Sequence, residues 1–174
     1  MRVARELNQK GMVVTLDHLG EHTTTTEESR QSAQHVLEIL GEIEKAGVRA
    51  NVSIKLTQIG LALGYEVCKE NLSTILTRAR ESDTFIRLDM EDYPWVSSTL
   101  QLYREMSDQF AGDSLGVVIQ SYLYRSEEDI SDLASRGARV RLCKGAYKEP
   151  ADIAFPKKTD VDTNYDRLTE MLID

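Results

Sequence analysis

Near its end the chain reads RVRLCKGAYKEP (residues 139–150), and the first six of these residues predict a short β-strand. Side chains alternate between the two faces of a strand, so Val140 and Leu142 share one face and Arg141 belongs to the other. This strand therefore has one apolar face and one charged face. The remaining segments of the chain have to explain why a buried strand carries an arginine at its centre.

Strands alternate with helices along the whole chain. Strand patterns cover residues 13–19, 51–59, 85–90, 115–122 and 139–144. Helices are expected between a Thr25–Glu28 capping box and Gly47, over 65–81, over about 96–110, between a Ser126–Asp129 capping signal and Gly137, and over 161–174. This order requires a parallel sheet with right-handed crossovers, which is built either as an open doubly wound sheet or as a (β/α)₈ barrel.

Polar residues on one face of each strand favour the barrel. Central strands of an open sheet are nearly continuous apolar runs because helices cover both faces. Here one face carries polar groups, namely Thr15, Asp17, Ser53, Lys55, Thr57, Arg87, Asp89, Gln120 and Arg141. No glycine-rich phosphate loop follows the first strand, as the doubly wound alternative would require. The sequence therefore predicts an α/β fold of the (β/α)₈ TIM-barrel type.

The length of the chain does not match a full barrel. Eight βα units take about 250 residues, whereas this chain has 174 and shows about five units. We therefore expect residues 1–174 to form part of one barrel domain. The expected missing parts are an N-terminal helical segment and the last three βα units.

Composition limits the classes of function. The net charge of −8 and the pI of about 5.0 argue against general nucleic-acid binding. No apolar run is long enough to cross a membrane, and the N-terminus lacks an apolar signal core. Cys68 and Cys143 fit no metal spacing and predict free thiols in the cytoplasm. His18 and His22 are four residues apart at a strand end, which favours loop histidines over a metal site.

Charged and amide side chains gather at the predicted carboxyl ends of the strands, where barrel enzymes have their active sites. They are Asp17, Lys55, Asp89, Gln120, Arg141 and Lys144. Together with Arg87 the cations outnumber the anions, which suits a ligand that is anionic or becomes so during reaction. The alternative is a set of internal salt bridges, such as Lys55 with Asp89, that only holds the barrel together.

Several segments together resemble the proline dehydrogenase family, specifically its monofunctional bacterial branch. The matching runs are SIKLTQIGL (53–61), FIRLDMEDYPW (85–95), LGVVIQSYLYRSEEDI (115–130) and RLCKGAYKEP (141–150), while LNQKGMVVTLDHLGEH (7–22) is similar to the family's first barrel strand. The resemblance covers essentially the whole chain in the correct order. It implies an FAD enzyme with a (β/α)₈ barrel that oxidises L-proline to Δ1-pyrroline-5-carboxylate, the first step toward glutamate.

The resemblance also implies roles for individual residues. Lys55 matches the lysine that meets the proline carboxylate, Asp89 the active-site aspartate, and Arg141 the active-site arginine near the flavin N5. The positions that match flavin contacts are Met90, Gln120, Arg141, Lys144, Gly145 and Ala146. If the resemblance holds, Lys55, Asp89, Gln120 and Arg141 gather around one space.

The resemblance leaves other questions open. The family's last helix carries a tyrosine and an Arg-Arg pair that complete the carboxylate clamp, and nothing here matches it, so we expect residues 1–174 alone neither to hold FAD firmly nor to oxidise proline. The electron acceptor is a quinone or another molecule, and peripheral membrane association is left open. A rival interpretation is a Schiff-base aldolase in which neighbouring cations lower the pKa of Lys55 or Lys144. A third is a partial barrel that serves only as a scaffold.

Overall fold

The structure is a computed structural model that describes residues 1–18, 20, 23–110 and 114–173. Its strands are β1 (Val14–Asp17), β2 (Ala50–Ile54), β3 (Ile86–Leu88), β4 (Leu115–Gln120) and β5 (Arg139–Cys143). The helices are α1 (Arg2–Gln9), α2 (Thr26–Ala46), α3 (Tyr65–Glu81), α4 (Tyr93–Gln109), α5 (Ser126–Ser135) and α6 (Lys158–Ile173). Strand and helix alternate from β1 onward, as the sequence predicts.

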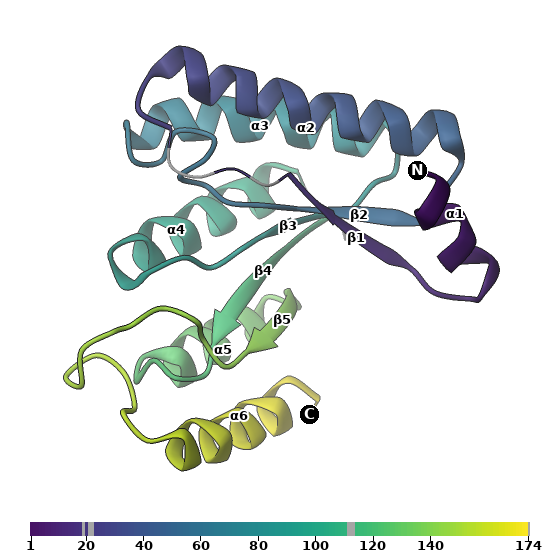
Figure 1. Cartoon of the computed structure of the whole chain (residues 1–174). Helices are drawn as coiled ribbons and strands as arrows, with labels where there is room; N and C mark the ends of the chain where they lie inside the picture. Colours follow the sequence, from purple (N-terminus) through teal and green to yellow (C-terminus); the bar gives the residue numbers. More distant parts are fainter. Residues whose placement is uncertain (19, 21–22, 111–113, 174) are drawn as a thin grey trace.

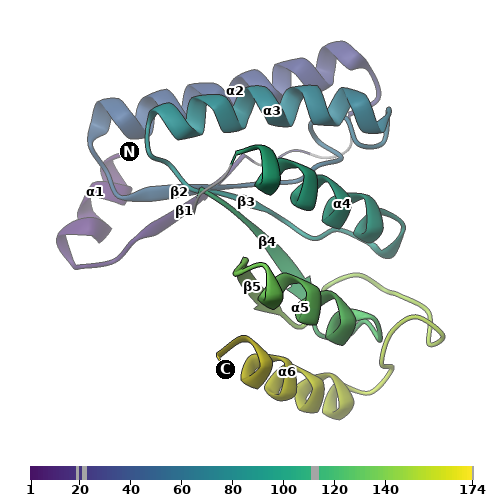
Figure 2. The ribbon, with the colours of Figure 1, turned by 180° about the vertical axis from the view of Figure 1, so that it is seen from behind.

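The five strands form one parallel sheet in chain order, β1-β2-β3-β4-β5. The sheet twists and fans out, and helices α2 to α6 lie along its outer side (Figures 1 and 2). This arrangement is a curled half-barrel with about five βα units, so the predicted TIM-barrel type of fold is confirmed. The carboxyl ends of the strands meet at one edge, as they must in a parallel sheet.

Apolar side chains between the sheet and its helices form the core. On the strands these are Val52, Ile86, Leu88, Val117 and Ile119, each at most 2% exposed. On the helices the largest fully buried ones are Leu40, Leu72, Ile75, Leu76, Leu100, Leu102 and Met106. Strand positions of the opposite parity, such as Arg87 and Asp89, therefore lie on the concave side of the sheet. No helix within the described residues is both long and apolar enough to cross a lipid bilayer.

The signals for the ends of α2 are confirmed. Thr25 and Glu28 form a capping box, in which the Thr25 hydroxyl accepts from the backbone N–H of Glu28. Gly47 ends the helix in the left-handed region, at φ +61°. Both predicted thiols are free: Cys68 is buried and Cys143 is half-buried.

Other predicted boundaries are wrong for identifiable reasons. Strand β2 ends at Ile54 because the apolar residues of 55–63 are buried in consecutive turns. Helix α4 begins at Tyr93, earlier than predicted, since Pro94 occupies its first turn. Ser126 does not cap α5, because its hydroxyl donates to the carbonyl oxygen of Gln120 at 2.5 Å.

Candidate active site

A cavity of about 430 Å³ opens at the carboxyl ends of β2 to β5. It is lined by Lys55, Asp89, Met90, Val118, Gln120, Arg141, Cys143, Lys144, Gly145, Ala146 and Tyr147. All eight site residues predicted from the sequence are among them. They come from four strands and the segments that follow, so the register of the parallel sheet brings them together. We refer to this space as the strand-end cavity.

Asp89 is the centre of the charges in the strand-end cavity. Its Oδ1 accepts a hydrogen bond from Ser53 Oγ at 2.8 Å and another from Arg141 Nη2. Lys55 Nζ lies 3.6 Å from Asp89 Oδ2 and 3.2 Å from Asp17 Oδ2. The Asp89 side chain is 14% exposed, whereas that of Arg141 is 40% exposed. The predicted contact between Lys55 and Asp89 is therefore present, and the carboxylate holds two cations from different strands.

The pKa values of the cavity lysines contradict one expectation. Burial lowers the pKa of Lys55, but the carboxylates of Asp17 and Asp89 raise it by more, so its pKa lies above the ordinary value. The hydrogen bond to Asp162 raises the pKa of Lys144. The expected lowering by neighbouring cations is wrong for both residues. Both amines stay protonated, which suits an anion anchor and disfavours a Schiff-base nucleophile.

Gln120, at the end of β4, carries an unused acceptor. The residue is 3% exposed, and its Nε2 donates to the carbonyl oxygen of Met90 at 3.5 Å. Its Oε1 is buried and has no hydrogen-bond partner among the described residues. A buried acceptor without a donor is costly, and such groups are uncommon in folded proteins. The amide therefore suits a ligand with an N–H group, and the imide N–H of a flavin ring is one such donor.

The segment after β5 explains why Gly145 is a glycine. Its φ of +108° is rarely adopted by other residues, and an added Cβ would lie 2.4 Å from Tyr122 Cδ1. Gly145 also lines the cavity, so the tight approach of Tyr122 is one reason for a glycine at this position. Further along, Glu149 Oε1 accepts from the backbone N–H of Tyr93 at 2.8 Å, which ties this segment to the start of α4.

Two of the predicted cations contribute less to the cavity than expected. Lys144 lines it, but its ammonium donates to Asp162 of α6 at 2.5 Å and is therefore already paired. Arg87 does not line it. Its guanidinium lies over the Phe85 ring, 5.0 Å from the ring centroid, nearer the amino ends of the strands. Lys55 and Arg141 are the remaining predicted cations at the cavity.

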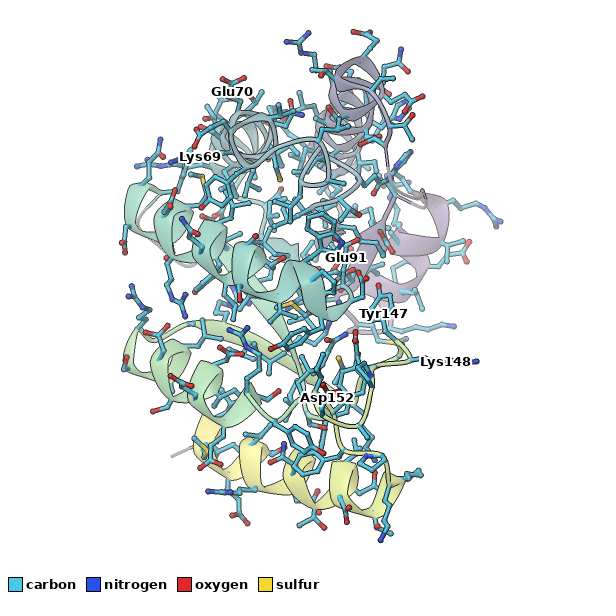
Figure 3. The ribbon with its side chains drawn as sticks, turned by 90° about the vertical axis from the view of Figure 1, so that its left-hand side faces the viewer. Lys69, Glu70, Glu91, Tyr147, Lys148 and Asp152 are labelled. Atoms are coloured by element: carbon cyan, nitrogen blue, oxygen red, sulfur yellow. The ribbon has the colours of Figure 1, made fainter. Side chains whose placement is uncertain are left out.

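Sequence reasoning missed several residues of this region. Tyr147 lines the cavity, and burial raises the pKa of its hydroxyl. Val118 and Cys143 complete the wall. Glu91 lies close to Tyr147 in Figure 3 and is only 3% exposed. A glutamate beyond a strand end is ordinarily solvated, so no pattern in the sequence marks it.

Of the two histidines weighed in the sequence, the structure describes only His18. The His18 ring lies 4.8 Å from the ring of His35, and its Nδ1 is 2.9 Å from Gln58 Nε2. His22 lies outside the described residues. In the part of the chain that the structure describes, no three His, Cys, Asp or Glu side chains are arranged to hold a metal ion.

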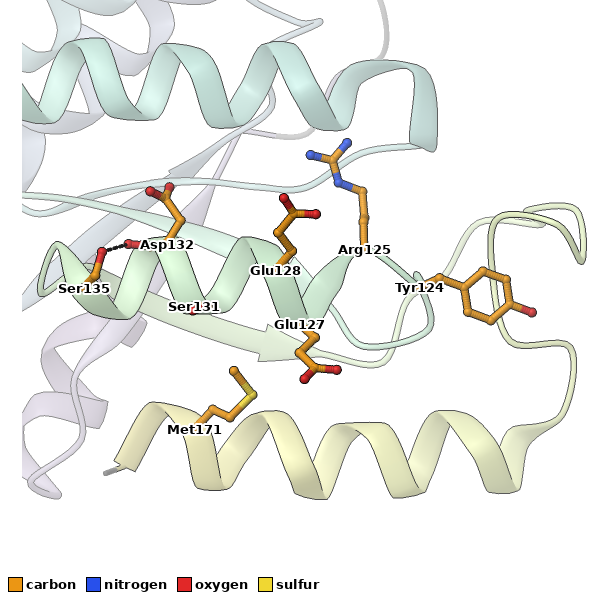
Figure 4. A pocket seen from close by; sticks show the side chains of 8 residues that line it. All are labelled: Tyr124, Arg125, Glu127, Glu128, Ser131, Asp132, Ser135 and Met171. Atoms are coloured by element: carbon orange, nitrogen blue, oxygen red, sulfur yellow. Dashed lines mark hydrogen bonds between the residues drawn. The ribbon is translucent and has the colours of Figure 1, made fainter.

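A second cavity, of about 690 Å³, lies on the outer side of the molecule along α5 and α6 (Figure 4). It is lined by Tyr124, Arg125, Glu127, Glu128, Ser131, Asp132, Ser135 and Met171, and none of the eight predicted site residues is among these. Most of its charges are paired with neighbours, since Arg125 bonds Asp129 at 2.7 Å and Asp132 accepts from Arg104 at 2.8 Å. We refer to this space as the helix groove.

Comparison with known proteins identifies the family. A family model described as proline dehydrogenase matches residues 1–174. The chain belongs to the proline dehydrogenase family. The resemblance found in the sequence is thereby confirmed.

Individual relatives agree with this assignment. "Proline dehydrogenase 2" of Bacillus subtilis is 37% identical over 164 residues, which are 94% of this chain and 54% of the relative. "Proline dehydrogenase" of Deinococcus radiodurans is 37% identical over 171 residues, which are 97% of this chain and 55% of the relative. The chain thus spans about half the length of these curated relatives.

Solved structures show the same fold. A proline utilization A protein (PutA) from Bdellovibrio bacteriovorus, inactivated by N-propargylglycine, superposes with a TM-score of 0.90 and 25% identity, covering 99% of this chain and 22% of that one. The PutA of Corynebacterium freiburgense gives a TM-score of 0.85 and 26% identity, covering 99% of this chain and 21% of that one.

Proposed function

We propose that this chain forms the strand-end cavity of an FAD-dependent enzyme that oxidises L-proline to Δ1-pyrroline-5-carboxylate, the first step of proline breakdown toward glutamate. One observation carries the proposal: all eight residues that match the family's site positions line a single cavity. Membership of the proline dehydrogenase family supports the choice of substrate.

Lys55 binds the carboxylate of proline in this proposal. Its raised pKa keeps the ammonium charged across the working range of an enzyme. Lys55 contacts two carboxylates, at 3.2 Å and 3.6 Å, and can exchange one of these contacts for the carboxylate of the substrate. Proline keeps its carboxylate when it becomes Δ1-pyrroline-5-carboxylate. The same ammonium therefore holds substrate and product, which fixes the ring during the reaction.

Asp89 and Arg141 set the charge at the reacting end of the cavity. Oxidation of proline removes a hydride from carbon and a proton from nitrogen, so charge moves during the reaction. Arg141 presents a planar fork of N–H donors to developing negative charge. Asp89 accepts hydrogen bonds from the Ser53 hydroxyl and from the guanidinium of Arg141, and thereby orients that guanidinium. Asp89 also limits the repulsion between Arg141 and the ammonium of Lys55.

The residues that hold the cofactor are those with unused or fixed polar groups. Gln120 offers its free Oε1 to a ring N–H, and Met90, Gly145 and Ala146 supply wall and backbone. Lys144 lines the cavity with its side chain, while its ammonium pairs with Asp162. A bound flavin supplies the two-electron acceptor. A quinone or another acceptor, at a membrane surface or away from one, then reoxidises the enzyme.

The test uses the natural protein, purified from its own cells. We expect the purified protein to show the visible absorbance of oxidised flavin, to lose it when L-proline is added without oxygen, and to reduce a redox dye in proportion to L-proline. The product is trapped with o-aminobenzaldehyde, and D-proline serves as the matched control. Proline-independent borohydride trapping of a carbonyl compound on Lys55 would instead favour the aldolase. A folded protein that binds no flavin would favour the scaffold.

A further inference from the structure

Glu91 is a buried carboxylate two residues beyond Asp89. It is 3% exposed, and within the described part of the chain it has no ion pair. Both of its oxygens are used by one residue: Oε2 accepts from the backbone N–H of Thr57 at 3.0 Å, and Oε1 accepts from the Thr57 hydroxyl at 2.5 Å. Thr57 is itself 2% exposed and lies two residues beyond Lys55.

These contacts hold the chain on both sides of Lys55. Before it, the carbonyl oxygen of Ile54 accepts from the backbone N–H of Asp89 at 2.9 Å. After it, the carbonyl oxygen of Lys55 accepts from the N–H of Gln58 at 3.2 Å, which makes Thr57 the third residue of a turn that begins at Lys55. Glu91 fixes Thr57, so the direction in which Lys55 leaves β2 is set from β3.

The first strand joins the same network. The Thr23 hydroxyl, 8% exposed, donates to the carbonyl oxygen of Thr57 at 3.2 Å. Thr57 thus links the segments after β1, β2 and β3, while the Lys55 ammonium contacts Asp17 of β1 and Asp89 after β3. If the turn that begins at Lys55 rotated, the Lys55 ammonium would move away from the carboxylates of Asp17 and Asp89.

A glutamate at position 91 would lower the stability of the fold if its only role were to fill space. A buried carboxyl group without a cation is costly, and an apolar side chain of similar volume fills such a space with less penalty. The hydrogen bonds to Thr57 recover part of that cost, since charged acceptors make strong bonds. A rigid clamp on the Lys55 turn accounts for a polar side chain that bonds both the N–H and the hydroxyl of Thr57 at this buried position.

We propose that Glu91, through Thr57, is a positioning residue that holds the Lys55 ammonium in place to bind the carboxylate of the substrate. This role rests on the proposed function for the identity of the substrate, but not for the position of Lys55. Neither Glu91 nor Thr57 lines the strand-end cavity, so neither is a catalytic residue.

The first measurement follows Lys55 without any catalysis. In the natural protein, limited acylation followed by mass spectrometry gives the reactivity of each lysine. Glu91→Ala and Thr57→Val should raise the reactivity of Lys55 about tenfold, because an amine that loses its carboxylate partners deprotonates more readily. Lys69, which bonds Glu105 away from the cavity, is the internal reference. Glu91→Gln keeps an acceptor for the Thr57 N–H and Thr57→Ser keeps the hydroxyl, so both should return Lys55 toward its original reactivity.

The second measurement separates positioning from stability. Thr57→Val should raise the KM for L-proline about tenfold, the worth of one anchoring hydrogen bond, with a smaller change in kcat, and Thr57→Ser should reverse it. Thr99→Val is the matched control, because Thr99 is also fully buried but its hydroxyl has no partner among the described residues. A lower melting temperature alone would not produce this split between KM and kcat.

The outcomes distinguish the two proposals. Unchanged reactivity of Lys55 in folded Glu91→Ala and Thr57→Val proteins overturns the positioning role, whatever the enzyme oxidises. Raised reactivity that the conservative variants reverse, in a protein that does not oxidise proline, leaves the positioning role and rejects the proposed function. Glu91→Gln behaving like Glu91→Ala would assign the effect to the charge of Glu91 and overturn the clamp.

Discussion

The strand-end cavity and the helix groove both carry several charged side chains, but they assemble them in different ways. In the cavity, Lys55, Asp89 and Arg141 come from separate strands and meet through the register of the sheet. In the groove, Asp132 and Glu127 of α5 form ion pairs with Arg104 of α4 and Arg167 of α6 on the outer surface. Partly exposed ion pairs of that kind stabilise a protein by less than about 1 kcal/mol each.

The two sites also differ in what they leave unused. The cavity contains a buried amide oxygen, Gln120 Oε1, with no partner among the described residues. Two of the acids that line the groove, Asp132 and Glu127, are partly exposed and already paired with Arg104 and Arg167. The larger volume of the groove is therefore a poorer guide to function than convergence and unsatisfied polar groups.

Arg141→Met is the strongest test of this difference. Removing the guanidinium takes away a fixed positive charge and leaves Asp89 without one of its two cations, so kcat/KM for L-proline should fall about 10³-fold. Steady-state dye reduction measures it. Arg167→Met, which removes the exposed arginine bonded to Glu127 near the groove, is the matched control and should leave kcat/KM unchanged. Equal losses in the two variants would show that convergence at the cavity has no special importance.

Two glycines allow the same comparison for stability. Gly145→Ala should lower the free energy of unfolding by about 3 kcal/mol, because the new Cβ meets the Tyr122 ring at a strained φ of +108°. Gly137→Ala, just after α5, also has a positive φ of +65°, but no described atom lies within 4 Å of its Cβ. It should cost only about 1 kcal/mol. Urea unfolding of both variants checks this, and equal costs would contradict the packing of Tyr122 against Gly145.

Gln120→Leu should affect flavin binding and stability in opposite directions. Loss of the amide removes a ligand hydrogen bond, so the flavin dissociation constant should rise about tenfold. The same change removes a buried acceptor without a donor, so the flavin-free protein should become about 1 kcal/mol more stable. Flavin fluorescence titration and thermal unfolding measure the two effects. A flavin-free protein that is destabilised instead would mean that Gln120 Oε1 has a partner within the protein.

The barrel type and the cavity could be predicted because both depend on periodicity. Alternation along 139–144 places Arg141 on the concave face, and parallel strands bring their ends to one edge, so residues far apart in sequence were correctly expected to share a space. Capping also follows local rules, as the Thr25–Glu28 box illustrates. These features need only the order of residues within one element, or the rule that joins one element to the next.

Features that depend on side-chain contacts between loops were not predictable. Glu91 bonds Thr57 across 34 positions, and no pattern in either segment indicates that pairing. One reason for Gly145 is the Tyr122 ring, which only the packed structure brings beside it. The Ser126 boundary failed in the same way, because a carbonyl oxygen at the end of β4 took the hydroxyl that the helix end would have used.

Asp132→Asn should have the smallest effect on the free energy of unfolding. The direction in which that effect changes with pH distinguishes the helix groove from the strand-end cavity. The hydrogen bond from Arg104, more than that from Arg136, holds the pKa of Asp132 below its ordinary value of 3.8. A carboxyl with a depressed folded pKa contributes stability above its unfolded pKa and loses it as the pH falls through the folded pKa. Asp132→Asn should therefore cost less than about 1 kcal/mol at neutral pH, since the pair is partly exposed.

That cost should shrink toward zero as the pH falls below the ordinary value of 3.8. Urea unfolding of both proteins at neutral pH and at about pH 3 measures it. Lys55 has the opposite sign: its raised pKa makes its contribution complete below the ordinary value of 10.5 and lost only as the pH rises through the higher folded value. The helix groove should thus weaken in acid and the cavity pair in alkali. Asp132→Asn should leave the KM for L-proline unchanged. A changed KM would contradict the independence of the two sites, because it would show that a helix-surface ion pair affects the strand-end cavity.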